Sequence, residues 1–271
     1  MVAAESIAMC REWYAASRDP SLWHDLNLTL LAHLMWVKMN LRANVRNLRE
    51  EVETSMGLFL DHVASIGSTL RSLKCLPHWA NLAAVVIDKL IRLDVDFGQL
   101  RHLELCLDSE TKLCVAQFLQ RLPHLTSLNL HTRHSIEDWP FPQLSVADQR
   151  LIAALDKMLD LQTVRMSCSI LPIDRHLLLH FLQCWTSLKR LELKFSQSSC
   201  ISYALISPSL EFLSIGGKAC LIDTICMPSL THLLLGDTYL SGFSSKHQEE
   251  ALLATGCPKL TVFQPQWHYV Q

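Results

Sequence analysis

Aliphatic residues recur along the chain in a six-residue pattern. Positions one, four and six are aliphatic, usually leucine, and the positions between them are mostly polar. Strict leucine copies begin at Leu100, Leu125, Leu188 and Leu230, and relaxed aliphatic copies begin at Leu161 and Leu210. Successive copies start 25, 36, 27, 22 and 20 residues apart. Because alternation with a period of two is typical of a strand that is buried on one face, each copy predicts a short strand.

The segments between these copies have a different periodicity. Apolar residues recur at helical spacing in 110–122, 147–161 and 173–185, and a further helix is expected at 248–254. Pro123, Pro208 and Pro228 each lie two residues before the start of a copy, where proline ends a preceding helix and its missing N–H group costs nothing. Strand, turn, helix and turn, repeated every 20–36 residues, predict an α/β solenoid with parallel strands.

Alternation also assigns the two faces of each predicted strand. The aliphatic residues at positions four and six point inward and stack on neighbouring units, because one unit cannot bury them alone. The residues between them point outward on a concave face, which is where solenoids bind their partners. Six residues of this face are candidates for binding, a charged group and an apolar group: Arg165, Arg190, Glu192 and Lys194, and Phe212 and Leu234.

We expect a protein partner on this face, with Phe212 as an anchor. Arginine and aromatic side chains carry much of the binding energy at protein interfaces. The alternative is that a neighbouring loop covers Phe212, since apolar side chains often occur singly at protein surfaces.

The hexads and their spacing resemble those of leucine-rich repeat proteins, over about residues 70–270. The resemblance implies an irregular horseshoe with parallel strands on the concave face, helices outside and a small helical cap at the N-terminus. The asparagine that usually follows the hexad is absent, because Ser169 and Ser196 stand there in two units. Hexad-like matches at Leu70, Leu82 and Leu90 are too close together for each to begin a unit.

The segment from Ala8 to Leu28 carries a second motif. It reads as a short helix that is broken at Asp19-Pro20-Ser21, followed by Leu22-Trp23 and a first strand around Leu26. The order of these residues resembles the C-terminal half of an F-box, and the residues that match the family pattern are Cys10, Trp13, Leu22 and Trp23. The Leu-Pro helix that opens a full F-box does not precede Ala8.

In the F-box family this motif docks a Skp-type adaptor, which joins the protein to a cullin. The same segment has a plainer interpretation as a helical cap that shields the first leucines of the solenoid from water. We therefore divide the chain into an F-box-like segment, residues 1–28, and a leucine-rich repeat domain, residues 29–271, whose clearest repeats span 100–271.

Composition excludes several classes of protein. Hydrophobic residues make up 49% of the chain and charged residues 18%, which is too apolar for a disordered protein. A net charge of −2 gives no field that would favour nucleic acid or an anionic membrane. The longest apolar stretch, 26–41, is interrupted by Lys38 and other polar residues, and no secretory signal is visible. We expect a cytoplasmic or nuclear protein that binds neither nucleic acid nor membrane.

No catalytic or cofactor motif stands out. The ten cysteines form no CxxC pair and are expected to be small buried hydrophobes. His176 and His180 are four residues apart on a predicted helix, but spacing places no third ligand beside them, so no metal site is expected. Glycine-rich phosphate loops and nucleophile elbows are absent from the sequence. We expect neither a cofactor nor an enzyme activity.

The two resemblances together imply the substrate-recognition subunit of an SCF-type (cullin-RING) E3 ubiquitin ligase, which binds a protein substrate through its leucine-rich repeats. The alternative is a free-standing leucine-rich repeat scaffold that no longer binds the Skp-type adaptor.

Overall fold

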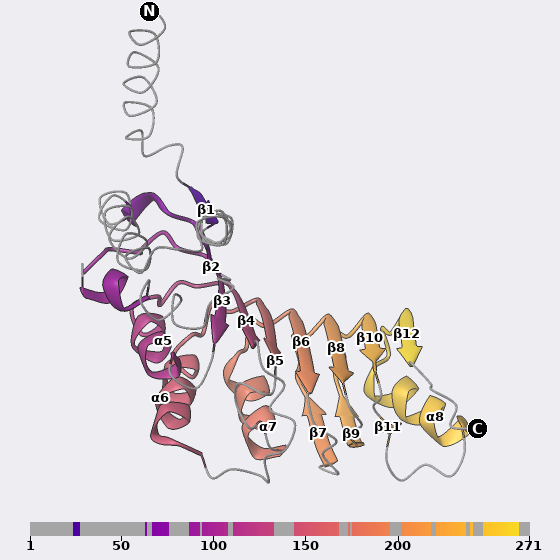
Figure 1. Ribbon diagram of the computed structural model, residues 1–271. Helices are drawn as coiled ribbons and strands as arrows, with labels where there is room; N and C mark the ends of the chain where they lie inside the picture. Colours follow the sequence, from indigo (N-terminus) through magenta and orange to yellow (C-terminus); the bar gives the residue numbers. More distant parts are fainter. Residues whose placement is uncertain are drawn as a thin grey trace, which may run out of the picture.

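The computed structural model describes the chain from the first predicted strand almost to the C-terminus, with gaps. The residues described are 24–27, 63, 67–75, 87–92, 94–107, 111–132, 144–167, 173, 175–195, 202–217, 221–236, 239–240 and 246–265. They form an α/β structure around one parallel sheet (Figure 1).

Nine strands make up this sheet, and they lie side by side in the order in which they occur along the chain. Every neighbouring pair is parallel. The strands are β1 (Asp25–Asn27), β2 (Ser72–Cys75), β3 (His102–Leu107), β4 (Ser127–Thr132), β5 (Thr163–Ser167), β6 (Arg190–Phe195), β8 (Phe212–Gly217), β10 (His232–Leu235) and β12 (Val262–Pro265). The strands predicted from the six hexads are all present, and each begins at the third position of its hexad.

Strand register follows the hexad. The fourth-position residue Leu103 lies opposite Leu73 on one side and Leu128 on the other, and the same alignment continues to Leu191 and Leu233. These side chains are buried, as are the sixth-position side chains that alternate with them. Leu70 begins the unit of β2, whereas Leu90 lies in a helical stretch, 87–92, and begins none. The third crowded match, Leu82, lies outside the described residues.

Each unit is also joined to the next at the second hexad position. The carbonyl of Arg101 accepts hydrogen bonds from the backbone N–H groups of Thr126 and Ser127, both at 2.9 Å, and the Thr126 hydroxyl donates to it at 3.1 Å. Thr231 and Thr261 donate in the same way to the carbonyl one unit before them. In these three units the threonine hydroxyl adds a third hydrogen bond to a carbonyl that already accepts two backbone N–H groups.

The connections that return from one strand to the next are of two kinds. Helices α5 (Lys112–Leu119), α6 (Val146–Leu155) and α7 (Arg175–Cys184) precede β4, β5 and β6. Strands β7 (Ser202–Ile206) and β9 (Leu221–Cys226) take their place before β8 and β10, and β11 (Tyr239–Leu240) and α8 (Lys246–Gly256) precede β12. A 3-10 turn, η2 (Gly67–Thr69), precedes β2. The strands β11, β9 and β7 pair in parallel as a second sheet, and Figure 1 shows the helices and this sheet succeeding one another beside the larger sheet.

Unit length explains the change from helix to strand. The units that begin at Leu188 and Leu210 have 22 and 20 residues, whereas the three before them have 25, 36 and 27. A strand advances about 3.3 Å per residue and a helix about 1.5 Å. Five extended residues therefore return the chain over the distance that needs about ten helical ones. The expectation of helices outside the strands is correct for the long units and wrong for the two short ones.

One contiguous apolar core lies between the large sheet and the return elements. Four of its aromatic members, Phe181, Trp185, Phe195 and Tyr203, lie where the helical returns end and the strand returns begin, and Phe97 and Phe118 pack against each other at α5. Trp185 stacks on Phe181 with ring centroids 4.5 Å apart, and its indole N–H donates to the Leu155 carbonyl at 3.1 Å. The Tyr203 hydroxyl donates to the Ile173 carbonyl at 2.9 Å. Each buried polar tip thus has an acceptor, as burial of Trp and Tyr requires.

Three expectations about single residues are wrong. Leu113 and Leu159 lie in the segments 110–122 and 147–161 that were predicted to have apolar helix faces, but they are 37% and 56% exposed. Leu113 is an exposed residue of α5, and Leu159 lies in the turn beyond α6, which ends at Leu155. Cys226, expected in the core, is exposed.

Gly256 was expected just beyond a helix but is the last residue of α8. Its role is close packing on β9. A Cβ atom at this position would stand 2.2 Å from the Ile225 carbonyl oxygen, and the Gly256 carbonyl accepts a hydrogen bond from Met227 N–H at 2.8 Å. Only a residue without a side chain allows this approach.

Candidate functional site

The face of the large sheet that is turned away from the core is not covered by the described residues. We call it the open face and define it by the outward residues of β2 to β10. None of these residues is buried, whereas the residues that alternate with them are. The members are Ser72, Lys74, His102, Glu104, Cys106, Ser127, Asn129, His131, Thr163, Arg165, Ser167, Arg190, Glu192, Lys194, Phe212, Ser214, Gly216, His232 and Leu234.

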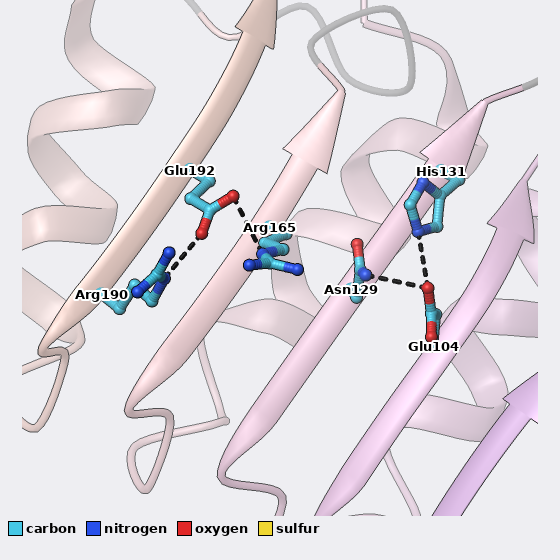
Figure 2. A network of polar contacts seen from close by, with 6 residues as sticks. All are labelled: Glu104, Asn129, His131, Arg165, Arg190 and Glu192. Atoms are coloured by element: carbon cyan, nitrogen blue, oxygen red, sulfur yellow. Dashed lines mark hydrogen bonds and ion pairs between the residues drawn. The ribbon is translucent and has the colours of Figure 1, made fainter. Parts of the chain in front are cut away.

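One charged cluster of the open face is centred on Glu192. Parallel register places Arg165 of β5 directly beside Glu192 of β6, and Arg190 precedes Glu192 by two residues on the same face. Glu192 accepts from Arg190 Nε at 2.6 Å through one oxygen and from Arg165 Nε at 2.9 Å through the other (Figure 2). The carboxylate therefore holds both guanidinium groups in fixed positions on the face.

An aromatic pair continues this cluster across the next two strands. Arg190, Phe212 and His232 are in register on β6, β8 and β10. The Arg190 guanidinium carbon lies 3.8 Å from the centre of the Phe212 ring, a cation–π arrangement. The His232 ring stacks against Phe212 with centroids 5.9 Å apart. Phe212 is half-buried, and the cover that sequence analysis assigned to a loop comes, in the described part of the chain, from these two neighbouring strands.

The structure thus joins four of the six predicted face residues into one row of contacts: Arg165, Glu192, Arg190 and Phe212. The other two lie on the same face. Lys194 is exposed and in register with Gly216, two residues beyond Glu192. Leu234 is half-buried, with Ser214 and Gln264 beside it in register. Phe212 and Leu234 therefore lie on the same face on the neighbouring strands β8 and β10, and Phe212 is already partly covered.

A second cluster, which sequence analysis did not single out, is centred on Glu104 of β3. Glu104 accepts from Lys74 Nζ at 2.8 Å, from Asn129 Nδ2 at 3.0 Å and from His131 Nε2 at 2.9 Å (Figure 2 shows the last two). Partial burial raises the pKa of Glu104, but the hydrogen bonds and positive charge of Lys74 and His131 outweigh it and hold the pKa below its ordinary value. The available signal was the hexad itself, because Glu104 and Asn129 are both fifth-position residues.

A shallow depression connects the two clusters. It has a volume of about 240 Å³ and is lined by the outward residues of β2 to β5, including Lys74, Glu104, Asn129 and Arg165. Pockets that enclose small ligands usually measure about 300–1,000 Å³. This hollow is smaller and polar, so it suits one or two protruding side chains of a partner better than an enclosed small molecule.

Positive charge predominates on the open face. Its lysines and arginines are Lys74, Arg165, Arg190 and Lys194, and its carboxylates are Glu104 and Glu192. Both arginines contact Glu192 through Nε, so within the described residues the terminal guanidinium nitrogens remain as donors toward solvent. Fixed guanidinium donors beside an aromatic ring suit a partner that presents carboxylates near apolar side chains.

The cysteine chemistry agrees in part with expectation. Burial raises the pKa of Cys75 to about 12, with a smaller contribution from Cys106. Burial likewise raises the pKa of Cys257 to about 11. These two thiols stay protonated at neutral pH and pack as small apolar side chains.

Two further expectations concern other parts of the chain. Cys10, Trp13, Leu22 and Trp23, the residues matched to the F-box pattern, lie outside the described residues. Leu26, in the strand expected after them, is buried in β1 and lies opposite Leu73 of β2.

Among the described residues, no helix has the length and apolar character that crossing a lipid bilayer would require.

Comparison with known proteins adds no family. No protein-family model matches the chain. A comparison with curated proteins likewise finds no match.

Proposed function

We propose that this chain is an irregular leucine-rich repeat protein that recognises a protein partner through the open face. The finer description of the fold, a solenoid curved into a horseshoe, is part of this proposal. It is supported by the strands, which follow one another in chain order with the hexad residues in register. The single observation that carries the function is the row of ordered contacts from Arg165 to His232 on a sheet face that the described residues leave uncovered.

The proposed partner surface combines acidic and apolar side chains. Glu192 positions Arg165 and Arg190 before any partner binds, which lowers the entropic cost of ordering these two side chains on binding. Phe212 lies beside Arg190, which places an aromatic group and a bidentate donor at the same spot. A protein segment suits this surface better than nucleic acid, because the whole chain carries a net charge of −2.

We further propose that the partner is a substrate and that the chain is the substrate-recognition subunit of an SCF-type E3 ubiquitin ligase. The support is the F-box-like string that contains Cys10, Trp13, Leu22 and Trp23. In this proposal the string contacts a Skp-type adaptor bound to a cullin, and the open face holds the substrate in the cytoplasm or nucleus. Because the open face does not depend on the string, a free-standing scaffold is the second candidate.

The test of the face uses a partner identified by cross-linking to the full chain and then purified. Arg190→Ala and Phe212→Ala should each weaken its binding about tenfold or more, because truncating a central arginine or aromatic residue usually costs more than about 1–2 kcal/mol. Arg150→Ala is the matched control, since Arg150 is exposed on α6 away from the open face. Binding that is equally strong in all three variants contradicts the proposal.

The test of the ligase role measures binding of a purified Skp-type adaptor to the full chain. Trp13→Ala and Trp23→Ala should reduce that binding, and Arg190→Ala should leave it unchanged. If the wild-type chain does not bind the adaptor but the face variants still lose the partner, the ligase role is wrong and the scaffold function stands.

A further inference from the structure

Three potential metal ligands of different chemistry meet between α6 and α7. Asp156 is the C-cap residue of α6, and His180 and Cys184 lie one turn apart on α7. Their ligand atoms all lie within 4.8 Å of one another. Asp156 Oδ1 is 2.9 Å from His180 Nε2, and Cys184 Sγ is 3.7 Å from each nitrogen of the same ring.

The third ligand of this group comes from tertiary packing. His176 and His180 are four residues apart in the sequence, and spacing alone placed no third ligand beside them. The structure pairs His180 with Cys184, one turn further along, and brings in Asp156 from 24 residues earlier. Asp156 can reach the site because α6 directly precedes β5 along the chain and α7 directly follows it, so the two helices are successive return elements.

We propose that Asp156, His180 and Cys184 form a binding site for a divalent transition-metal ion, with Zn²⁺ as the best fit. A carboxylate, an imidazole and a thiolate are the three ligand types that Zn²⁺ takes in proteins. Tetrahedral Zn²⁺ with ordinary bond lengths separates sulfur from nitrogen by about 3.5 Å and nitrogen from oxygen by about 3.3 Å. The 2.9 Å between Asp156 Oδ1 and His180 Nε2 lies a few tenths of an ångström below the second of these separations. Cys184 Sγ is 3.7 Å from both ring nitrogens, so the imidazole has to rotate about its Cβ–Cγ bond to direct Nε2 at an ion that Sγ also binds.

Exposure of the cluster suits an ion that enters from solvent. The side chains of His180 and Asp156 are 48% and 33% exposed, so the ion has access and water can occupy the fourth coordination position. Three protein ligands and one water are the usual arrangement of an open Zn²⁺ site. The ion would tie the end of α6 to α7, and we assign it this structural role.

Proton balance follows from the ligand types. Burial raises the pKa of Cys184, as does the nearby Asp156 carboxylate, so the metal-free thiol is protonated. When the ion binds, the thiol proton passes to solvent and the thiolate becomes the ligand.

A natural control lies one unit earlier. His124 Nδ1 and Asp160 Oδ2 form the same type of pair at 3.3 Å, with side chains 60% and 56% exposed. Among the described residues, the Asp156 cluster is the group of three ligands, and the His124 pair belongs to no such group. Cys114 is a second control, because it is a half-buried free cysteine on α5, as Cys184 is on α7.

The experiment is a titration of the reduced, full-length protein with Co²⁺, followed by displacement with Zn²⁺. Wild type should show a thiolate-to-cobalt charge-transfer band with one ion bound per chain, and Zn²⁺ should abolish the band. Cys184→Ser should remove the band. His180→Ala and Asp156→Asn should weaken binding about 100-fold or more, since even residues that only orient ligands cost about 10–100-fold. His124→Ala and Cys114→Ser should match wild type.

Thermal unfolding gives a second readout. Zn²⁺ should raise the Tm of wild type and of the two control variants, and it should leave the Tm of Cys184→Ser unchanged. A charge-transfer band that survives in Cys184→Ser, or that Cys114→Ser diminishes equally, would overturn the assignment. Circular dichroism of each variant without metal shows that a lost band does not reflect a lost fold.

Discussion

The two halves of the large sheet share one ladder and differ in what returns the chain behind it. From β3 to β6 the returns are the helices α5, α6 and α7, and from β6 to β10 they are the strands β7 and β9. The hexad register is the same in both halves. The front of each unit is therefore set by its leucines, and the back is set by how many residues remain to reach the next unit.

The two kinds of return are also held together differently. In the helical half, side chains connect successive returns: Lys112 of α5 contacts Asp148 of α6 at 2.7 Å, and Trp185 donates to the last turn of α6. In the strand half, the backbone makes the connection through the ladder between β7 and β9. We therefore expect point substitutions to damage the helical half more, because a backbone ladder survives the loss of one side chain.

The largest predicted effect lies at the end of the helical half. Trp185→Ala should lower the free energy of unfolding by about 3–5 kcal/mol, because it empties a large buried volume and leaves the Leu155 carbonyl without its indole donor. Denaturant unfolding followed by circular dichroism measures the change. A loss below about 1 kcal/mol would mean that Trp185 is not the packing centre of this half.

Much of the front of the sheet was predictable from the sequence. Alternation identified the buried and outward residues of the predicted strands, since a period of two admits only one face to the core. The returns of the short units were not predicted, because five residues such as Ser202–Ile206 carry too little periodicity to identify a strand. The unit length of 22 residues was the signal that could have excluded a helix there.

The candidate sites divide in the same way. Arg165 and Glu192 could be placed on one face from the hexad, and parallel register makes them neighbours. The contact between Glu104 and Asn129 could have been expected, because both are fifth-position residues on neighbouring strands, whereas the contact with Lys74 could not, because its unit was not assigned among the crowded matches near Leu70. The Asp156 cluster depends on how α6 packs near α7, which no local pattern encodes.

The second-largest predicted effect on the free energy of unfolding concerns the ion pair between Lys112 of α5 and Asp148 of α6. Asp148 accepts from Lys112 and forms a capping box with Ser145, and both side chains of the ion pair are largely buried. Asp148→Asn should cost about 2 kcal/mol, because Lys112 loses its counter-charge. Adding Lys112→Met to the Asp148→Asn variant should cost little more, since the two residues act together. Denaturant unfolding of the two single variants and the double variant measures this coupling.

The dependence of the free energy of unfolding on pH, measured at acid pH, gives a second test of this prediction. Burial raises the pKa of Asp148, but the bonds from Lys112 and Ser145 lower it more, so the folded pKa lies below the ordinary value. The ionised form therefore stabilises the fold fully above the ordinary aspartate pKa of about 4. This contribution is lost as the pH falls through the lower pKa of the folded state. Asp148→Asn should flatten that part of the curve. An unchanged acid slope would mean that the pair does not join the helices.

The smallest predicted effect tests the strand half. Tyr203 is buried in β7, and its hydroxyl donates to the Ile173 carbonyl just before α7, the boundary between the two kinds of return. Tyr203→Phe keeps the ring against Phe195 and removes the hydroxyl that donates to Ile173, so it should cost about 0.5–1.5 kcal/mol. Hydrogen exchange should show faster opening of β7 and unchanged protection of α6, because the ladder to β9 remains intact. If Tyr203→Phe costs as much as Trp185→Ala, the strand half depends on side-chain connections as strongly as the helical half, and the proposed difference between the two halves is wrong.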